Sequence, residues 1–145
     1  GARWNEDYGD PESDINRFSA AMAGVGTLDH FIATMARQDE PGTVCLYNSA
    51  DTQALGSLLI NATGQSITDY MQSRICDRLG FESSGYWMID SVDREMAFGG
   101  LNLIARDFAK LGELFRCDGC WNGEQIVPAD WVQQSVQANE PHPGW

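Results

Sequence analysis

The sequence predicts an α+β chain that is mostly helical and has short strands. Apolar residues recur at helical spacing in several segments that begin with a capping residue. Short runs of strand-forming residues stand between Gly and Asp turn signals. The composition is that of a folded globular chain, since 43% of the 145 residues are hydrophobic and 21% are charged.

The charge balance argues against several classes of partner. The chain has 21 acidic and 9 basic residues, which gives a net charge of −12, and Lys110 is its single lysine. Phosphate binding needs clustered Lys and Arg, so we expect no nucleic-acid partner. No apolar run approaches the roughly 18–20 residues that cross a bilayer, so we expect no membrane insertion. The oligomeric state is left open.

The first third of the chain predicts an irregular segment followed by a helix. Residues 1–26 are rich in Gly, Asp, Ser and Asn, with a short helix expected near Ile15 to Met22. A long stretch without secondary structure is unusual inside a compact domain and often forms part of a functional lid. Thr27 is expected to cap a helix that ends at Pro41 and Gly42. Residues 44–46 then predict a short buried extended run that leads to Tyr47 and Asn48.

The middle of the chain predicts two helices with clear ends. Ser49 is the expected N-cap of the first, which should end at Gly64. Its expected buried residues are Ala54, Leu55, Leu58, Leu59 and Ala62. Ser66 and Asp69 resemble a capping box for the next helix, which should end at Gly80.

The last third predicts a hairpin, two helices and two tight turns. Residues 86–89 and 95–98 should form a small hairpin around residues 90–93. A helix should follow Gly99 and Gly100, with Ala105, Phe108, Leu111 and Phe115 facing inward. Turns are expected at residues 118–119 and 122–123, and a last helix from Pro128 to about Gln137.

The four cysteines do not predict a metal site. Only Cys117 and Cys120 are close in sequence, and Asp118-Gly119 between them is a turn signal. A tetrahedral zinc site usually needs two close pairs. Cys45 and Cys76 stand in apolar contexts, where Cys acts as a small buried residue. Their spacing leaves the redox compartment open, either bacterial cytoplasm or periplasm.

Four ordered segments together resemble one family. They are Glu6-Asp7-Tyr8 with Asp10-Pro11, residues 47–52 (Tyr-Asn-Ser-Ala-Asp-Thr) with Leu55-Gly56, residues 98–112 with Gly-Gly-Leu and Ala-Arg-Asp-Phe-Ala-Lys-Leu-Gly, and residues 121–132 with Ile-Val-Pro and Trp-Val. The chain resembles serine hydrolases related to class C β-lactamases and penicillin-binding proteins, in the branch that includes 6-aminohexanoate-dimer hydrolase. The match covers nearly the whole chain.

The resemblance implies an internal fragment, residues 1–145, of one β-lactamase/transpeptidase-like domain that is truncated at both ends. The family nucleophile belongs to a Ser-x-x-Lys pair, and three residues before Lys110 stands Asp107, so that pair is absent. The late His-x-Gly or Lys-Thr-Gly segment is absent as well. The implied fold places helices beside an antiparallel sheet whose larger part lies outside this chain.

Tyr47 is the residue that the resemblance marks as catalytic. A phenol with a pKa near 10 is only about 0.1% ionised at pH 7, so it is a poor base alone. It becomes useful when a neighbouring ammonium stabilises the phenolate and a serine hydroxyl lies within about 2.6–3.2 Å. In the family, a lysine supplies that charge.

Four further residues are candidates for supporting or binding roles. In the family, the position of Ser49 helps to order the site by hydrogen bonds, so the resemblance implies such a role for Ser49 and, with less support, for Asn48. The place of Ser49 before a helix makes it a cap rather than a nucleophile. The family loop that matches Tyr8 closes over substrate, although an aromatic in a solvated acidic loop needs no function. Trp87 on the hairpin could line a substrate pocket or belong to the core.

The resemblance implies hydrolysis of a small-molecule amide or ester through an acyl-enzyme, with no metal or organic cofactor. Without its nucleophile, the fragment is expected to be inactive alone. Two alternatives remain: a D-alanyl-D-alanine carboxypeptidase or β-lactamase of the same fold, and a non-catalytic penicillin-binding-protein-like binding module. A stand-alone acidic interaction domain would require these residues to fold cooperatively by themselves.

Overall fold

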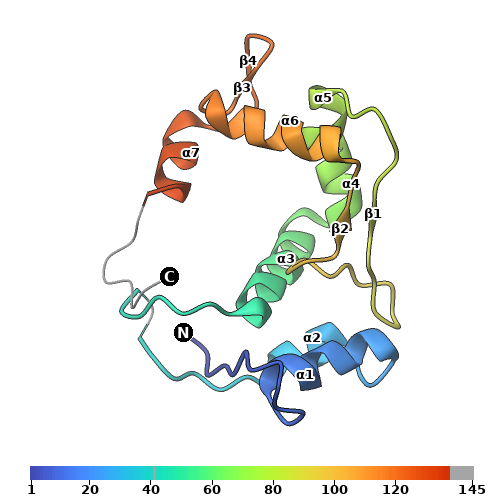
Figure 1. Cartoon of the computed structure of the whole chain (residues 1–145), viewed down its shortest axis with the longest axis vertical. Coiled ribbons are helices and arrows are strands. Elements are labelled where there is room, and N and C mark those ends of the chain that lie inside the picture. Colours follow the sequence, from blue (N-terminus) through green and yellow to red (C-terminus); the bar gives the residue numbers. More distant parts are fainter. Residues whose placement is uncertain (41, 138–145) are drawn as a thin grey trace.

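The computed structural model describes residues 1–40 and 42–137. Its helical elements are α1 (Asp14–Ser19), the 3-10 helix η1 (Ala20–Ala23), α2 (Leu28–Ala33), α3 (Ser49–Thr63), α4 (Ile67–Met71), the π-helix η2 (Gln72–Cys76), α5 (Asp77–Leu79), α6 (Ala105–Arg116) and α7 (Ala129–Ser135). Strand β1 (Tyr86–Trp87) pairs antiparallel with β2 (Leu101–Asn102), and β3 (Cys120–Trp121) with β4 (Glu124–Gln125). The chain is thus mostly helical with short strands, as predicted (Figure 1).

The main hydrophobic core lies where α1, α2 and the start of α3 meet. Its buried residues are Trp4, Ile15, Phe18, Ala21, Leu28 and Ala50. The Phe18 ring contacts Trp4 edge-on at 5.9 Å between centroids and Phe98 at 4.9 Å. Because Trp4 and Ala50 share this core, the N-terminal segment is fixed against the first turn of α3.

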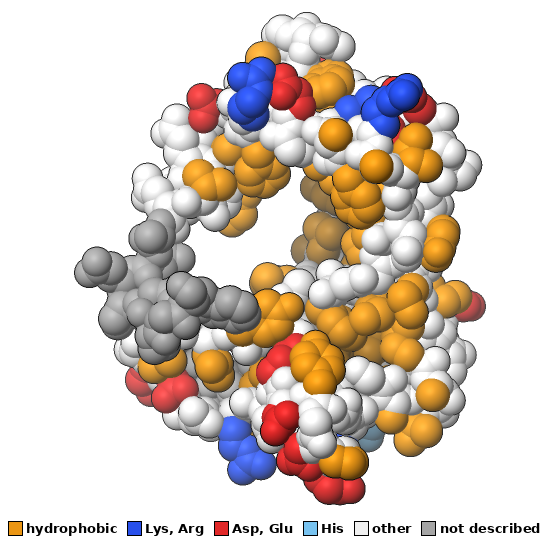
Figure 2. Space-filling model, in the orientation of Figure 1, with side chains coloured by type: hydrophobic (Ala, Val, Ile, Leu, Met, Phe, Trp, Pro, Cys, Tyr) orange, Lys and Arg blue, Asp and Glu red, His pale blue; other side chains and the backbone are white. Residues whose placement is uncertain are grey.

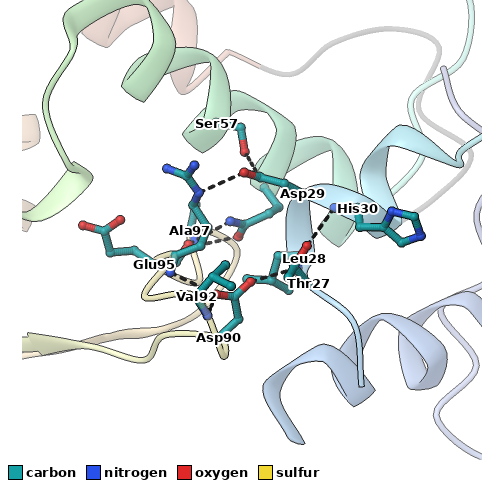
Figure 3. Close-up of polar contacts among 11 residues, drawn as sticks. Thr27, Leu28, Asp29, His30, Ser57, Asp90, Val92, Glu95 and Ala97 are labelled. Carbon is teal, nitrogen blue, oxygen red and sulfur yellow. Dashed lines mark hydrogen bonds and ion pairs between the residues drawn. The ribbon is translucent and has the colours of Figure 1, made fainter. Parts of the chain in front are cut away.

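A buried polar network joins α2 and α3 to residues 90–97 (Figure 3). One Asp90 carboxylate oxygen accepts from the Leu28 N–H at 3.0 Å. Arg94 Nε donates to Asp29 Oδ2 at 2.9 Å. From α3, the fully buried Gln53 amide donates to the Glu95 carbonyl and accepts from the Ala97 N–H, each at 2.7 Å. These contacts hold the loop against both helices, since each buried polar group has its partner.

Several predicted helix ends are confirmed. Thr27 accepts from the His30 N–H at 3.1 Å, and Ser66 accepts from the Asp69 N–H at 3.0 Å. Helix α3 ends at Gly64, whose φ of 69° suits glycine. The predicted end of α2 at Pro41 is wrong, because the helix stops at Ala33 and an antiparallel bridge then joins Arg37 to Ala2.

The predicted buried face of α3 is wrong. Leu55 and Leu58 are 64% and 61% exposed, whereas Gln53 and Gly56 are buried. A side chain at Gly56 would meet the Ala97 Cβ at 2.7 Å. The buried face therefore consists of small residues and one amide, because α3 packs too closely on residues 95–97 to accept leucine there.

The predicted inner face of α6 is wrong as well. Phe108 and Phe115 are 44% and 43% exposed, and Leu114 and Asp107 are buried. Asp107 is buried because it accepts from the backbone N–H of Glu82 at 3.0 Å and from Lys110 Nζ at 3.1 Å. Arg106 pairs with Glu82 at 2.8 Å, and Lys110 contacts both Glu82 and Asp107, so these residues form one network around the loop before β1.

Other local predictions have mixed outcomes. The expected hairpin is present as a bridge between Ile89 and Glu95, but β1 pairs with β2, whose strand character was not predicted. Residues 44–46 are exposed and belong to none of the described strands, which contradicts the expected buried run and a buried Cys45. No helix in the described ranges is long and apolar enough to cross a membrane.

Candidate active site

Tyr47 lies at the end of the exposed segment 44–47, immediately before α3. The Asn48 backbone is extended, and its side-chain oxygen accepts from the Asp51 N–H at 3.0 Å. Asn48 is therefore the N-cap, and the expectation that Ser49 has this role is wrong. Asn and Ser cap helices about equally well, so the neighbouring contacts decide between two adjacent candidates.

Ser49 is the first residue of α3 and is 4% exposed. Its hydroxyl donates to Glu6 Oε1 at 2.7 Å, a partner 43 residues earlier in the chain. A buried hydroxyl that donates to a carboxylate is placed to support the site rather than to attack a substrate. The supporting role of Ser49 stays a prediction, and the contact with Glu6 is one that the sequence did not reveal.

The Glu6 carboxylate joins three other side chains. Oε1 accepts from Ser49 and, at 2.9 Å, from the Tyr8 hydroxyl. Oε2 accepts from the indole N–H of Trp4, whose ring belongs to the core. Glu6 therefore links the core, the N-terminal loop and the first turn of α3. Its sequence signal was its place two residues before Tyr8 in the Glu-Asp-Tyr motif, but no role was predicted for it.

The loop that presents Tyr8 is ordered by its own polar side chains. Asp7 Oδ1 accepts from the Gly9 N–H at 2.8 Å, and Asn5 Oδ1 accepts from the Asp7 N–H at 3.0 Å. From α1, the Asn16 amide donates to the carbonyls of Asp10 at 2.8 Å and Tyr8 at 3.1 Å. The segment that composition predicts to be irregular is therefore held in one conformation by Asx-type contacts.

Tyr8 and Tyr47 belong to one electrostatic environment. The hydrogen bond to Glu6 raises the pKa of Tyr8 above its ordinary value, because ionisation of the phenol would lose that bond and place two negative charges side by side. Tyr47 adds a smaller contribution in the same direction. The two phenols are 69% and 53% exposed. Through Glu6, the Tyr8 hydroxyl is joined to Ser49 in the first turn of α3, two residues after Tyr47.

Tyr47 also lines a shallow hollow of about 350 Å³ at the start of α3. Its other lining residues are Cys45, Leu46, Asn48, Asp51, Thr52 and Leu55. Lys110 is bound elsewhere, since its Nζ lies 3.1 Å from Asp107 and 3.2 Å from Glu82. An ammonium that activates Tyr47 therefore does not come from Lys110.

Trp87 is not among the residues that line the Tyr47 hollow. It lines a second cavity of about 490 Å³ together with Met71, Phe81, Leu101 and Leu103, among others. Asn48 thus shares the hollow with Tyr47, and Glu6 joins Ser49 to Tyr8, whereas Trp87 lies at a different cavity. A substrate-binding role for Trp87 stays a prediction.

The described residues contain no group of three or more His, Cys, Asp or Glu side chains that could hold a metal ion. Cys117 is a free thiol with its sulfur 3.6 Å from Glu113 Oε1. Burial raises the pKa of Cys117, which favours the thiol over the thiolate that metals bind.

The two tight turns predicted at residues 118–119 and 122–123 are confirmed, because Asp118, Gly119, Asn122 and Gly123 adopt positive φ values.

Comparison with known proteins places this geometry in a family. Residues 1–144 match the Beta-lactamase family. The chain is 24% identical over 137 residues to a 6-aminohexanoate-dimer hydrolase of Paenarthrobacter ureafaciens. That alignment covers 90% of this chain and 35% of the relative.

The fold gives the same relationship. The structure resembles that of a Bacillus anthracis protein assigned to the 6-aminohexanoate-dimer hydrolases, with a TM-score of 0.81 and 25% identity. The similarity covers 92% of this chain and 38% of that protein, so this chain spans little more than a third of either relative. The predicted β-lactamase/transpeptidase-like fold is thereby confirmed, and the chain belongs to the β-lactamase family.

Proposed function

We propose that this chain supplies one wall of the active site of a serine hydrolase that cleaves amide or ester bonds through an acyl-enzyme. The observation that carries the proposal is the position of Tyr47. It precedes the capped start of α3, beside a loop that Glu6 ties to Ser49, in a chain whose residues 1–144 match the β-lactamase family.

In this proposal, Tyr47 moves the protons of the reaction. The nucleophilic serine and a lysine come from the Ser-x-x-Lys segment that the family relationship implies outside this chain. The serine Oγ attacks the carbonyl carbon and gives its proton to the Tyr47 phenolate. Tyr47 then passes that proton to the departing nitrogen or oxygen, and the acyl-enzyme forms. In the second half, water gives a proton to the Tyr47 phenolate as it attacks the acyl carbon. Tyr47 returns that proton to the serine Oγ as the bond from the serine to the acyl carbon breaks, which releases the carboxylic acid and restores the phenolate.

The other side chains have positioning roles. Asn48 fixes the helix start beside Tyr47, and Ser49 holds Glu6, which in turn holds the Tyr8 hydroxyl. Tyr8 is exposed, is joined through Glu6 to the first turn of α3, and is proposed to contact the substrate amide. A short linear amide is the proposed substrate class, because the named Paenarthrobacter relative acts on the dimer of 6-aminohexanoate.

The test uses a composite enzyme, defined as the Bacillus anthracis relative in which this chain replaces the region that it matches. Tyr47→Phe should lower kcat for the 6-aminohexanoate dimer by about 10²–10⁴-fold, the typical contribution of a general acid–base group. KM should change little, because the phenol acts mainly in the transition state. Tyr86→Phe is the matched control, since Tyr86 is a similarly exposed phenol at 65%. Equal kcat values for the two variants would remove Tyr47 from the mechanism.

A further inference from the structure

Two of the four cysteines stand at the two ends of one tight turn. Cys117 follows the last residue of α6, and Cys120 is the first residue of β3. The Cys120 N–H donates to the Cys117 carbonyl at 2.9 Å, and Asp118 and Gly119 between them have φ values of 50° and 79°. Such a turn keeps the Cα atoms of its end residues within about 7 Å. Disulfides join Cα atoms that are about 4.4–6.8 Å apart, so this backbone separation suits a disulfide.

The turn is fixed by the segment that follows it. The Gly119 carbonyl accepts from the N–H groups of Ile126 at 2.8 Å and Val127 at 3.1 Å. The Gln125 amide donates to the Asp118 carbonyl at 2.7 Å. A Cβ added at Gly119 would collide with the Val127 carbonyl oxygen, so only glycine allows this close approach. Because folding has already ordered these residues, closing a disulfide here costs little further conformational entropy.

The two thiols share one electrostatic environment. Burial raises the pKa of Cys117, and the neighbouring Cys120 adds a smaller contribution in the same direction. The Arg116 guanidinium lies 3.3 Å from the Cys117 sulfur and opposes this rise, but Glu113 Oε1 lies 3.6 Å from the same sulfur and offsets Arg116. A stabilised thiolate is what makes a disulfide easy to reduce. The raised pKa of Cys117 therefore favours the oxidised form of the pair.

The pair can be reached from solvent. Cys117 and Cys120 are each partly exposed free thiols. The β3–β4 hairpin that begins at Cys120 projects at one end of the molecule in Figure 1, and the same end in Figure 2 shows acidic and basic side chains beside a few hydrophobic ones. Within the described residues, no group of three or more His, Cys, Asp or Glu side chains could hold a metal ion there. The chemistry open to this pair is therefore that of a dithiol.

We propose that Cys117 and Cys120 are a redox-active pair that closes reversibly to a disulfide, with a small-molecule disulfide of the glutathione class as the oxidant. The thiolate of one cysteine attacks the oxidant, which forms a mixed disulfide and releases one thiolate. The second cysteine, as its thiolate, then attacks the sulfur of the first and releases the other half of the oxidant. The pair gives up two electrons and two protons, and the oxidant becomes two thiols. The new bond joins the end of α6 to β3, and the proposal does not depend on the chemistry at Tyr47.

The test is peptide mapping of the composite enzyme after equilibration with an excess of oxidised over reduced glutathione. Free thiols are blocked with N-ethylmaleimide before digestion. Trypsin cleaves after Arg116, and residues 117–145 contain no Lys or Arg, so both cysteines enter one peptide. We expect this peptide to lack two hydrogens and to carry neither the blocking group nor glutathione. Cys117→Ser and Cys120→Ser are the matched controls, because each leaves one thiol without its partner, and that thiol should carry glutathione.

A second measurement separates the native turn from the sequence alone. The equilibrium constant for closure by glutathione is measured in the native composite enzyme and again in urea. Because the native turn holds the two cysteines together, the constant should be at least about tenfold larger in the native protein.

Two results would overturn the proposal. In the first, either cysteine of the unaltered peptide stays free or carries glutathione in the oxidised buffer. In the second, the native and unfolded closure constants differ by less than that factor, so the fold does not prepare the pair for closure. Neither result depends on kcat, so the proposed function is tested separately.

Discussion

Replacement of Glu6 by glutamine tests the link between the N-terminal loop and α3. The carboxylate has two acceptor oxygens, which receive Trp4 on one side and Tyr8 and Ser49 on the other. A glutamine amide has one acceptor oxygen and one NH₂ group. In Glu6→Gln, either the Trp4 donor or the Tyr8 and Ser49 donors must therefore face that NH₂ group instead of an acceptor. The variant keeps the size of the side chain and removes only this complementarity.

The cost follows from the burial of the donors. Trp4 and Ser49 are 9% and 4% exposed, so either donor loses a partner that water cannot readily replace. A hydrogen bond to a charged group contributes about 1.5–3 kcal/mol. Tyr8 is exposed, and its hydroxyl can turn to water at little cost. We therefore expect Glu6→Gln to lower the free energy of unfolding by about 2–3 kcal/mol.

The assay is urea-induced unfolding of the composite enzyme, followed by circular dichroism. Glu12→Gln is the control, because it removes the same charge from an exposed side chain of the same loop. It should change the free energy of unfolding by less than about 0.5 kcal/mol. If both variants unfold at the same urea concentration, the carboxylate does not hold the loop, and the reasoning about Tyr8 fails with it.

Four other predictions concern the N-cap Asn48, the pKa values of Tyr8 and Asp90, and the activity of this chain alone. Asn48→Ala should cost about 0.5–2 kcal/mol as a lost N-cap, whereas Asn61→Ala on the exposed side of α3 should not, by the same unfolding assay. Tyr8 should titrate above its ordinary pKa of 10.0, so its contribution to stability is present below pH 10.0 and is lost as the pH rises through the raised pKa. Ultraviolet titration should show the pKa of Tyr8 returning toward 10.0 in Glu6→Gln. Burial opposes ionisation of Asp90, but hydrogen bonds from the backbone N–H groups of Leu28, Arg94 and Val92 outweigh it and lower the pKa of Asp90. Its contribution to stability is therefore present above pH 3.8 and is lost as the pH falls through the lowered pKa, so Asp90→Asn should flatten the dependence of stability on pH in acid. This chain alone should hydrolyse neither p-nitrophenyl esters nor nitrocefin above a buffer blank, and labelling of one serine by a fluorophosphonate would show that the nucleophile has been misplaced.

The sequence predicted elements well where the signal is local. The caps at Thr27 and Ser66 and the helix end at Gly64 depend on residues within one turn, and the structure contains them. The Asn48–Ser49 boundary was off by one residue. Either residue can cap a helix, and the choice is made by Glu6, a partner distant in sequence.

Helix faces were predicted poorly where burial depends on tertiary contacts. The leucines of α3 and the phenylalanines of α6 have the spacing of a buried stripe, but inside this chain the buried faces contain Gln53 and Asp107. Those polar residues are buried because the loops at 95–97 and 82–83 provide their hydrogen-bond partners. Periodicity detects an apolar stripe but does not identify the layer that covers it.

The roles of the candidate site residues stay predictions. Tyr47, Ser49 and Tyr8 were named from motifs; in the structure Ser49 and Tyr8 both donate to Glu6, and Tyr47 precedes the start of α3. Trp87 was named from its aromatic character alone, which does not tell one cavity from another. The role of Glu6 could not be predicted, because a carboxylate among acidic residues gives no sign of three donors converging on it.

The central claim is that Tyr47 exchanges a proton with a serine supplied from outside this chain. The most direct measurement is a crystal structure of the composite enzyme with a fluorophosphonate bound covalently to its reactive serine. The account predicts that the Tyr47 hydroxyl lies within about 2.6–3.2 Å of the modified serine Oγ. A Tyr47 side chain that points away from that oxygen, with another residue at hydrogen-bond distance in its place, would contradict it.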